Sequence, residues 1–338
     1  MSLKERLLQP DFTEIYVEQG IKAQADSILS RFPAAHVIEI KDYRDVFDRP
    51  RQSYALQHKS QKLILAKKKD GFLYPGSPVC QSFGNPYFMY SSCVMNCVYD
   101  CSYCFLKGMY PGGNLAVFVN LEDYFEAVEK ELQKHPLYIC VSYDADLLSL
   151  ESILGYGRAW SAFAKAHDRL TIEIRTKGTF DKTWQKMTVS CRTILAFTLS
   201  PSSIIAKEEK GTPSLSARMT MLKEAMNLGF PVRICFDPVL MCIDQKQAYR
   251  DLVEETARTI DLQKVRDFSI GSFRLSKVYM ARMRRQYPDS AVLQYPYVCE
   301  KGFYHLPAQM EADMTDSIVE ALAEHGIGKE KIFFWRES

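Results

Sequence analysis

Cys93-Val-Met-Asn-Cys-Val-Tyr-Asp-Cys-Ser-Tyr-Cys-Phe105 holds four of the ten cysteines of the chain, and the rest of the sequence is interpreted around it. Thiolates are preferred ligands of soft metal ions and of iron–sulfur clusters. The spacing of Cys97, Cys101 and Cys104 supplies three thiolates to one centre. A four-iron cluster bound in this way keeps one iron for an outside ligand, and Cys93 lies too early in the chain to fit the spacing.

The spacing alone does not exclude two other uses of these cysteines, a zinc site and a disulfide knot. A zinc site usually combines two Cys-x2-Cys pairs, or cysteine with histidine. This stretch has one such pair, and the nearest histidine is His135. Cys93 and Cys97 could still join the pair in a zinc-binding nucleic-acid module. A disulfide knot requires an oxidising compartment.

Length, composition and charge narrow the class of protein. The 338 residues, 47% of them hydrophobic, suit one α/β barrel with extensions. A net charge of +2 argues against bulk electrostatic capture of nucleic acid, although it leaves room for a local basic groove. No signal peptide and no membrane-spanning run is expected. With ten cysteines, the chain is therefore predicted to work in a reducing cytoplasm, away from membranes.

The hydrophobic pattern predicts alternating strands and helices after residue 86. Residues 1–35 are predicted to be helical, followed by strands at 36–40 and 63–66. The later strands are expected at 87–91, 137–142, 170–177, 193–200, 232–239 and 265–273. The helices between them are expected at 121–134, 150–167, 180–189, 214–229 and 246–260. Such alternation makes six βα units with parallel strands, in a partial barrel or in a doubly wound open sheet.

The C-terminal segment departs from this alternation. A basic helix is predicted at 274–287, an aromatic-rich hairpin at 291–306, an amphipathic helix at 311–325 and a closing strand at 331–335. We therefore expect three parts: an N-terminal α/β extension at 1–85 packed on the barrel, the barrel at 86–275, and a C-terminal hairpin and helix extension at 276–338.

The cysteine stretch resembles the signature of the radical S-adenosylmethionine superfamily, including the aromatic residue before the last cysteine. Further segments resemble spore photoproduct lyases, in particular the shorter clostridial branch, from about residue 40 to the end. These segments occur in the family's order: Asp100–Leu106, Val117–Glu122, Arg175–Lys177, Phe197–Leu199, Gly211-Thr212, Arg218 and Gly229–Pro231.

The resemblance implies a fold, a reaction and a set of partners. The fold is a partial (β/α)6 TIM-type barrel, with chemistry at the carboxyl ends of its strands. The reaction is repair of 5-thyminyl-5,6-dihydrothymine to two thymines, started by a 5′-deoxyadenosyl radical that takes hydrogen from C6. The cofactors are a [4Fe-4S] cluster and S-adenosylmethionine, and the partners are UV-damaged DNA and a reductant such as flavodoxin or ferredoxin. The alternative is a radical enzyme acting on another nucleotide or on a peptide.

The family motifs also carry residue roles to this chain. Cys97, Cys101 and Cys104 would bind the cluster, and Tyr103 would pack against the adenine. The remaining cofactor contacts would come from three strand ends: Ser142, Lys177 and Thr198. An ammonium at a strand end suits a carboxylate. The alternatives are a core aromatic at position 103 and a solvent-exposed lysine at 177.

The hydrogen donor has two candidates. Cys140 matches the family's donor cysteine in Cys140-Val-Ser142, and Cys80 lies in a turn-rich loop before the first barrel strand. Cys140 is preferred, although a buried strand cysteine is commonly inert. Phe105 stands where the family has a tyrosine, so the donor pathway of this chain is expected to differ from the usual one.

DNA contacts are expected from the hairpin near the C-terminus. The resemblance assigns them to Tyr297, Lys301 and Tyr304, since aromatic side chains stack on bases. No arginine remains within this hairpin, and the basic residues Arg282, Arg284 and Arg285 fall on the preceding helix. The alternatives are ordinary packing of the hairpin on the barrel and a solvated helix face.

Overall fold

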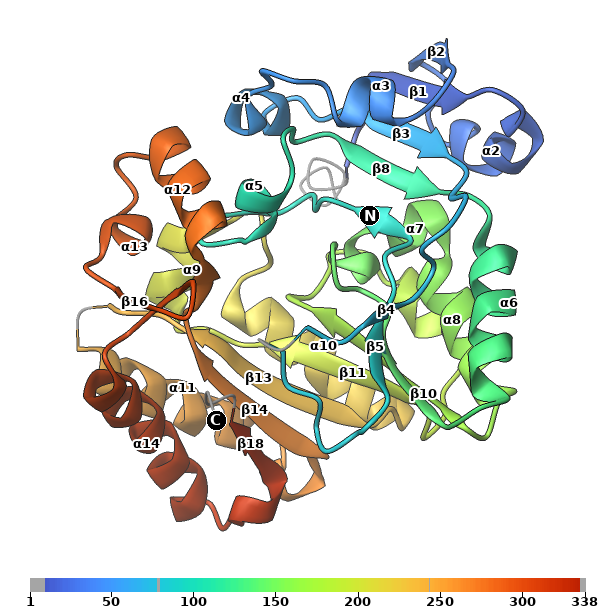
Figure 1. The fold of residues 1–338 in the computed structure, drawn as a ribbon. Coiled ribbons are helices and arrows are strands. Elements are labelled where there is room, and N and C mark those ends of the chain that lie inside the picture. The colour runs from blue at the N-terminus through green and yellow to red at the C-terminus, as the bar shows by residue number, and fades with distance from the viewer. Residues whose placement is uncertain (1–9, 78–79, 243, 335–338) are drawn as a thin grey trace.

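The computed structural model describes residues 10–77, 80–242 and 244–334 (Figure 1). Its main sheet has eight strands in the order β18-β14-β13-β11-β10-β9-β5-β4. Six successive members from β5 to β14 are parallel, and they confirm the predicted partial barrel. Their bounds are Phe88–Tyr90 (β5), Leu137–Cys140 (β9), Leu170–Thr176 (β10), Thr193–Thr198 (β11), Val232–Val239 (β13) and Asp267–Ser272 (β14).

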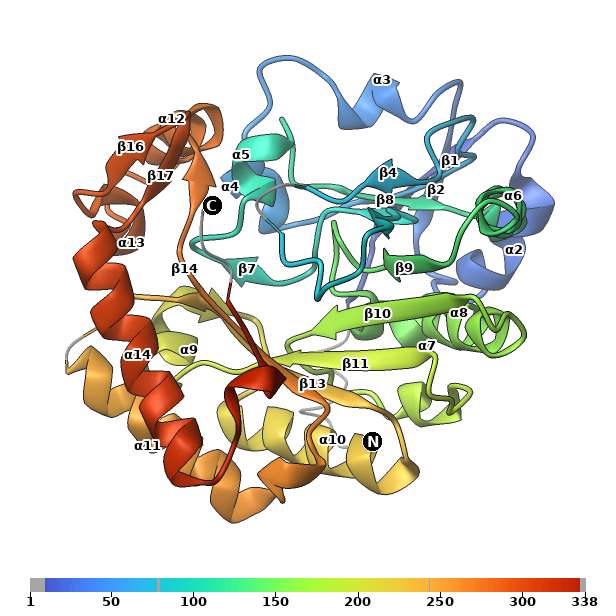
Figure 2. The ribbon, with the colours of Figure 1, turned by 60° about the horizontal axis from the view of Figure 1, so that its bottom comes forward.

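One further strand extends the sheet at each edge. The closing strand β18 (Ile332–Phe334) pairs in parallel with β14, and β4 (Tyr74–Pro75) pairs antiparallel with β5. Residue 335, the end of the predicted closing strand, lies outside the described residues. The sheet is curled and open on one side, where the carboxyl ends of its strands face the cysteine stretch (Figures 1 and 2).

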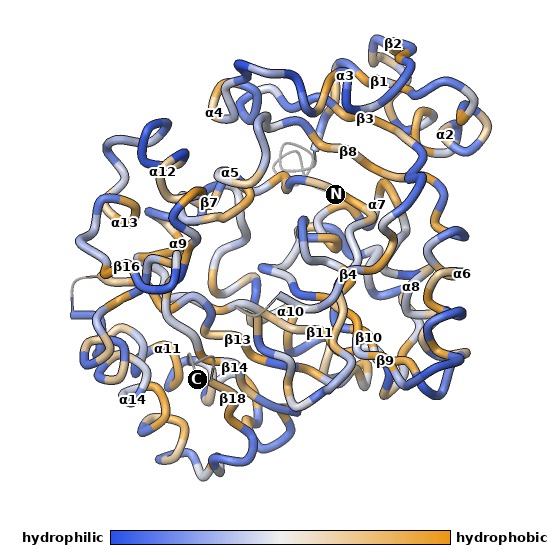
Figure 3. Tube along the Cα trace, in the orientation of Figure 1, coloured by the Kyte–Doolittle hydropathy of each residue, from blue (hydrophilic) through white to orange (hydrophobic). Residues whose placement is uncertain are grey.

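Helices cover the outer face of the curled sheet (Figure 2). They are α6 (Leu121–Leu132), α7 (Glu151–Leu154), α8 (Tyr156–Lys165), α10 (Leu215–Leu228), α11 (Gln245–Thr259) and α14 (Ala308–Glu324). The hydropathy trace is mainly apolar along the central strands and alternates with polar residues along these helices (Figure 3). None of the helices within the described ranges is long and apolar enough to cross a membrane.

Two of the predicted helices differ in the structure. The segment predicted at 150–167 is divided by Gly155, whose φ of +67° is readily adopted by glycine. The helix predicted at 180–189 is wrong: only a 3-10 turn forms, at Thr183–Lys186. Trp184 and Met187 are its buried apolar side chains, and they lie three residues apart, so a single turn is enough to bury both.

The N-terminal segment forms a second sheet, in the order β2-β1-β3-β8-β6. The prediction of helix over 1–35 is wrong at β1 (Glu14–Glu18), where Ile15 and Val17 are buried on alternate positions. The helix prediction is confirmed at α2 (Lys22–Leu29), and residues 1–9 lie outside the described range. The remaining elements are β2 (His36–Ile40), α3 (Arg44–Phe47), α4 (Tyr54–His58), β3 (Leu63–Ala66), β6 (Val94–Met95) and β8 (Leu115–Phe118).

This second sheet joins the N-terminal extension to the cysteine stretch. β8 pairs in parallel with β3 and antiparallel with β6, so strands that follow residue 86 complete the sheet. The Gln61 side-chain amide donates to the carbonyl oxygens of Cys97 and Gly113, at 3.0 and 2.8 Å. The extension therefore supports the backbone of the cysteine stretch directly.

The first part of the C-terminal extension packs beside α5 (Leu106–Met109), next to the cysteine stretch, whereas α14 packs against α11 on the outer face (Figure 1). The basic helix forms as α12 (Lys277–Gln286), and α13 (Ala291–Gln294) occupies the first part of the predicted hairpin. The hairpin itself is shorter, with β16 (Val298–Glu300) and β17 (Phe303–His305), and β15 (Leu275–Ser276) completes a three-stranded sheet.

Candidate active site

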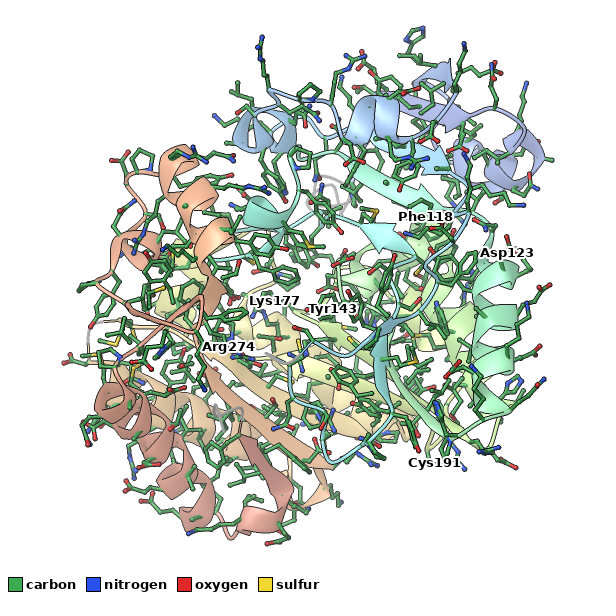
Figure 4. All side chains as sticks on the ribbon, viewed as in Figure 1. Phe118, Asp123, Tyr143, Lys177, Cys191 and Arg274 are labelled. Carbon is green, nitrogen blue, oxygen red and sulfur yellow. The ribbon has the colours of Figure 1, made fainter. Side chains whose placement is uncertain are left out.

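A cavity of about 770 Å³ lies at the carboxyl ends of the barrel strands, between the cysteine stretch, α12 and the hairpin. In Figure 4, Lys177, Tyr143 and Arg274 point toward this central space, whereas Cys191 lies at the far edge of the molecule. Nine of the residues singled out in the sequence line it: Cys80, Cys97, Cys101, Tyr103, Cys104, Cys140, Ser142, Lys177 and Thr198. The tertiary structure therefore brings together segments that are up to 118 residues apart in the chain, from Cys80 to Thr198.

The loop that carries the three cysteines is held at several points. The two-residue strand β7 (Asp100–Cys101) pairs antiparallel with β12 (Glu209–Lys210), and α5 (Leu106–Met109) follows directly after Cys104. Asn96 adopts a φ of +72°, and its buried amide donates to the carbonyl oxygens of Gly112 and Asn114. These contacts fix the loop on both sides of the cysteines.

The three cysteines of the spacing come together in the fold. All line one cavity, and burial raises the pKa of each, that of Cys97 to about 12. Thiols of this kind release their protons when they bind metal. Among the described residues, no group of three or more His, Cys, Asp or Glu side chains lies close enough to hold a metal ion.

Cys93 is separate from this set. Its side chain is buried and does not line the cavity. Burial raises the pKa of its thiol to about 12. Its position therefore agrees with a core residue.

The Lys177 ammonium lies in a network of buried polar groups beside the cysteine loop. Its Nζ donates to the Tyr103 hydroxyl at 2.9 Å and lies 3.4 Å from Glu209 Oε1. Burial alone would raise the pKa of Glu209, but Lys177 and Arg218 outweigh it, and the pKa of this carboxyl is lowered to about 2. The carboxylate is therefore charged, and the lysine is oriented rather than free in solvent.

The two hydroxyls predicted at the cofactor site have different surroundings. The Ser142 hydroxyl accepts from the Arg175 backbone N–H at 2.7 Å and bridges the ends of β9 and β10. Thr198 is buried at the end of β11, and its carbonyl oxygen accepts from Arg218 at 3.1 Å. Both lie on the cavity wall, where their hydroxyls can reach a ligand.

A second charged group also lines the cavity. Asp237 lies 3.0 Å from the Arg274 guanidinium and 3.6 Å from that of Arg175. Although burial favours its neutral form, the two arginines lower the pKa of Asp237 below its usual range. Asp237 lies within β13, which continues to Val239 as predicted for residues 232–239.

The two candidate donor thiols line the same cavity but have different neighbours. Cys140 is buried at the end of β9, and its pKa is raised to about 12 by burial. Cys80 is partly buried, and its thiol donates to the Tyr143 hydroxyl at 3.6 Å. The Tyr143 ring lies 5.6 Å from that of Phe105, so a tyrosine stands beside the position where the family tyrosine is missing.

None of the three residues predicted to contact DNA lines the cavity. Tyr297 packs 5.1 Å from the rings of both Phe273 and Tyr295, and Tyr304 packs under the Arg284 guanidinium. Lys301 is exposed at the turn of the hairpin. Phe303, the next residue but one, does line the cavity.

Two of the three arginines of α12 bind backbone carbonyl oxygens, and the third is exposed. Arg284 donates to the carbonyl oxygen of Leu293 at 2.7 Å, and Arg282 donates to that of Gly108 at 3.0 Å. Arg285 is exposed, and no hydrogen bond or ion pair joins it to another described residue. Val278, 59% exposed on the same helix, lies at the rim of the cavity.

Sequence reasoning missed several residues of this site. Glu209, Tyr143 and Asp237 had no periodic or spacing signal, because each is placed by contacts from distant segments. Glu208-Glu209-Lys210 has the composition of a solvated charged turn. Arg218 had been noted only as part of a family motif.

The model of the spore photoproduct lyase family matches residues 86–295. The chain belongs to the spore photoproduct lyase family. A spore photoproduct lyase mutant has a similar solved structure, with a TM-score of 0.82 and 16% identity over 97% of this chain and 99% of that one. No curated protein matches the sequence.

Two ligand-bound spore photoproduct lyases also share the fold. One is complexed with dinucleoside spore photoproduct, with a TM-score of 0.80. The other, a mutant with bound AdoMet and dinucleoside spore photoproduct, has a TM-score of 0.79. Each is 16% identical over 97% of this chain and 99% of the matched chain. At this identity the likeness establishes the fold.

Proposed function

We propose that this protein is a DNA repair lyase that reverses 5-thyminyl-5,6-dihydrothymine to two thymines. The observation that carries the proposal is that the three cysteines and the four expected cofactor residues line a single cavity in a member of this family. When bound, a [4Fe-4S] cluster and S-adenosylmethionine supply a 5′-deoxyadenosyl radical that takes hydrogen from C6 of the lesion. The residues present fit both groups.

The residues of the chain bind and orient these groups. Cys97, Cys101 and Cys104 hold the cluster, since their thiols share the cavity and lose a proton on binding iron. Lys177 faces the cofactor carboxylate, and Tyr103 presents its ring beside the cysteine loop. Ser142 and Thr198 complete the contacts from neighbouring strand ends. The buried part of the wall, which includes Cys101, Cys140 and Thr198, excludes water and competing reactants.

The hydrogen donor is either Cys140 or Cys80, both of which reach the cavity. Replacing the donor by alanine leaves cofactor cleavage intact and diverts the product radical to abortive products, whereas replacing the other cysteine leaves thymine release unchanged. Comparing Cys140→Ala with Cys80→Ala under identical conditions assigns the role. Cys191→Ala is the matched control, because that cysteine is exposed and lies far from the cavity (Figure 4).

Damaged DNA approaches from the side of α12 and the hairpin. Tyr297, Lys301 and Tyr304 remain the proposed hairpin contacts, and the exposed Arg285 adds a cation nearby on α12. The lesion leaves the base stack to reach the cavity. A reduced flavodoxin or ferredoxin supplies the electron, and a reducing cytoplasm keeps the cysteines as thiols.

The decisive experiment is anaerobic repair of a dinucleotide spore photoproduct. The protein is reconstituted with iron and sulfide and reduced in the presence of S-adenosylmethionine, and released thymine dinucleotide is quantified by chromatography. Recovery by the wild type, and none by Cys101→Ala, is the expected result. Formation of 5′-deoxyadenosine without repair would retain the radical chemistry and reject this substrate, and zinc in place of iron and sulfide would reject both.

A further inference from the structure

Glu209 is a buried carboxylate that none of the roles above requires. It lies on β12 and pairs with Cys101 across the short antiparallel ladder, so its backbone is attached to the cysteine loop. Its side chain is almost completely buried, at 1% exposure, although the sequence around it has the composition of a solvated turn. A buried charge is costly unless it is paired and hydrogen-bonded. The contacts of the Glu209 carboxylate therefore indicate its role.

Both oxygens of this carboxylate are fully engaged. Oε1 accepts hydrogen bonds from the Tyr103 hydroxyl at 2.5 Å and from the Ser200 hydroxyl at 2.9 Å, and it lies 3.4 Å from the Lys177 ammonium. Oε2 accepts from the Arg218 guanidinium, which is itself completely buried. Glu209 thus joins the cysteine loop, the end of β10 and the segment after β11 in one network.

The charges of this network do not cancel. Two cations, Lys177 and Arg218, face Glu209, so these three groups together carry one net positive charge. Of the three, Lys177 lines the cavity, as the carboxylates of Asp146 and Asp237 also do. An ammonium has three N–H donors. Two of them have partners in Tyr103 and Glu209, and Lys177 lines the cavity, so the third is available to a ligand. A carboxylate is the ligand group that complements both the charge and the donor.

We propose that Glu209 is a positioning residue of the cofactor site: it holds the Lys177 ammonium and the Tyr103 ring in the orientation that receives the methionyl carboxylate. This inference rests on the proposed function, because it takes S-adenosylmethionine as the ligand. Arg218 balances the charge of Glu209 and leaves that of Lys177 for the ligand. Glu209 itself touches neither the cluster nor the reacting atoms.

The charge balance dictates which variant tests the proposal. Glu209→Gln alone leaves Arg218 buried without its counter-charge, which destabilises the fold and raises the local positive charge. The double variant Glu209→Gln with Arg218→Gln keeps the net charge of +1 on Lys177 and removes only its anchor. Tyr103→Phe is the second variant, since it keeps the ring and all three charges but removes the hydroxyl that bridges Lys177 and Glu209, leaving their direct contact at 3.4 Å.

The readout is the affinity of the iron-loaded protein for two ligands, measured by equilibrium dialysis without reductant. S-adenosylmethionine carries the carboxylate, and 5′-methylthioadenosine has the same adenosine and a thioether without it. We expect the affinity of the double variant for S-adenosylmethionine to fall about tenfold, which is the value of one charge-assisted hydrogen bond. Its affinity for 5′-methylthioadenosine should be unchanged. Tyr103→Phe should show the same selective loss to a smaller extent. Glu224→Gln, a partly exposed carboxylate remote from the cavity, serves as the control.

The outcomes distinguish the positioning role of Glu209 from the proposed function. Equal losses for both ligands in both variants, or no loss for either, would overturn the positioning role, since a residue that only stabilises the loop does not distinguish the carboxylate. Iron content and thermal unfolding of each variant are measured beside the affinities, and Tyr103→Phe decides the question if the double variant does not fold. Failure of the wild type to bind S-adenosylmethionine would instead overturn the proposed function.

Discussion

The inner wall and the rim of the cavity are built on different principles. At the inner wall and directly behind it, Lys177 and Glu209 each have at least two polar partners, and Arg218 is completely buried. At the rim, Lys301 and Arg285 are exposed, and Val278 is 59% exposed. Electrostatic contacts gain strength where water is excluded and are screened where it is not. We therefore expect the cofactor to be held by a few strong contacts and DNA by many weak ones.

The largest effect is expected on the inner wall, at the proposed cluster ligands. Cys101→Ala removes one of three thiolates, so the cluster should be lost, and formation of 5′-deoxyadenosine should fall to background. Iron and sulfide content and chromatography of the reduced reaction measure both. Cys191→Ala should behave like the wild type, and an active Cys101→Ala protein would remove this residue from the ligand set.

Next in size is the loss of the charge network below the cavity. Arg233 is almost completely buried between Glu173 and Asp267, so Arg233→Met removes the guanidinium that joins two buried carboxylates, and leaves Glu173 with Arg175 and Asp267 with Arg266. We expect the free energy of unfolding to fall by about 3–5 kcal/mol, measured by urea denaturation. Arg285→Met at the rim should change it by no more than about 0.5 kcal/mol. Similar losses in the two variants would contradict the division between wall and rim.

Lys177→Met is expected to weaken the binding of S-adenosylmethionine by about 10- to 100-fold, the range for a lost hydrogen bond between charged groups. The side chain keeps its apolar part and loses the ammonium, so the affinity for 5′-methylthioadenosine should change little. Equilibrium dialysis with both ligands measures the difference. Lys264→Met, an exposed lysine outside the cavity, is the control. Unchanged S-adenosylmethionine binding would show that the carboxylate lies elsewhere.

The smallest effect is expected at the hairpin turn. Lys301→Ala should reduce the salt dependence of DNA binding by about 0.9 in the slope of log affinity against log salt, the value for one phosphate contact. Fluorescence anisotropy with a labelled duplex at several salt concentrations measures it, and Lys264→Ala is again the control. A slope equal to that of the wild type would exclude a phosphate contact at Lys301.

Much of the fold follows from local patterns in the sequence. Parallel barrel strands are buried on both faces, and runs such as Thr193–Thr198 show this as continuous apolar residues. The amphipathic helix α6 is visible in its 3.6-residue period. The helix expected at 180–189 and the strand β1 were misjudged, because their short apolar spacings fit more than one element until neighbouring segments are known.

The sequence by itself determined the class of fold and predicted the role of the three cysteines. Both depend on short spacings: Cys97, Cys101 and Cys104 fall within eight positions, and the strand and helix periods repeat within each unit. Only the tertiary structure decided that Glu209 is buried against Tyr103 and Lys177, and that Asp237 lies between Arg175 and Arg274. The physical reason is that the state of a charged side chain depends on which distant groups exclude water from it, and local sequence does not encode those groups.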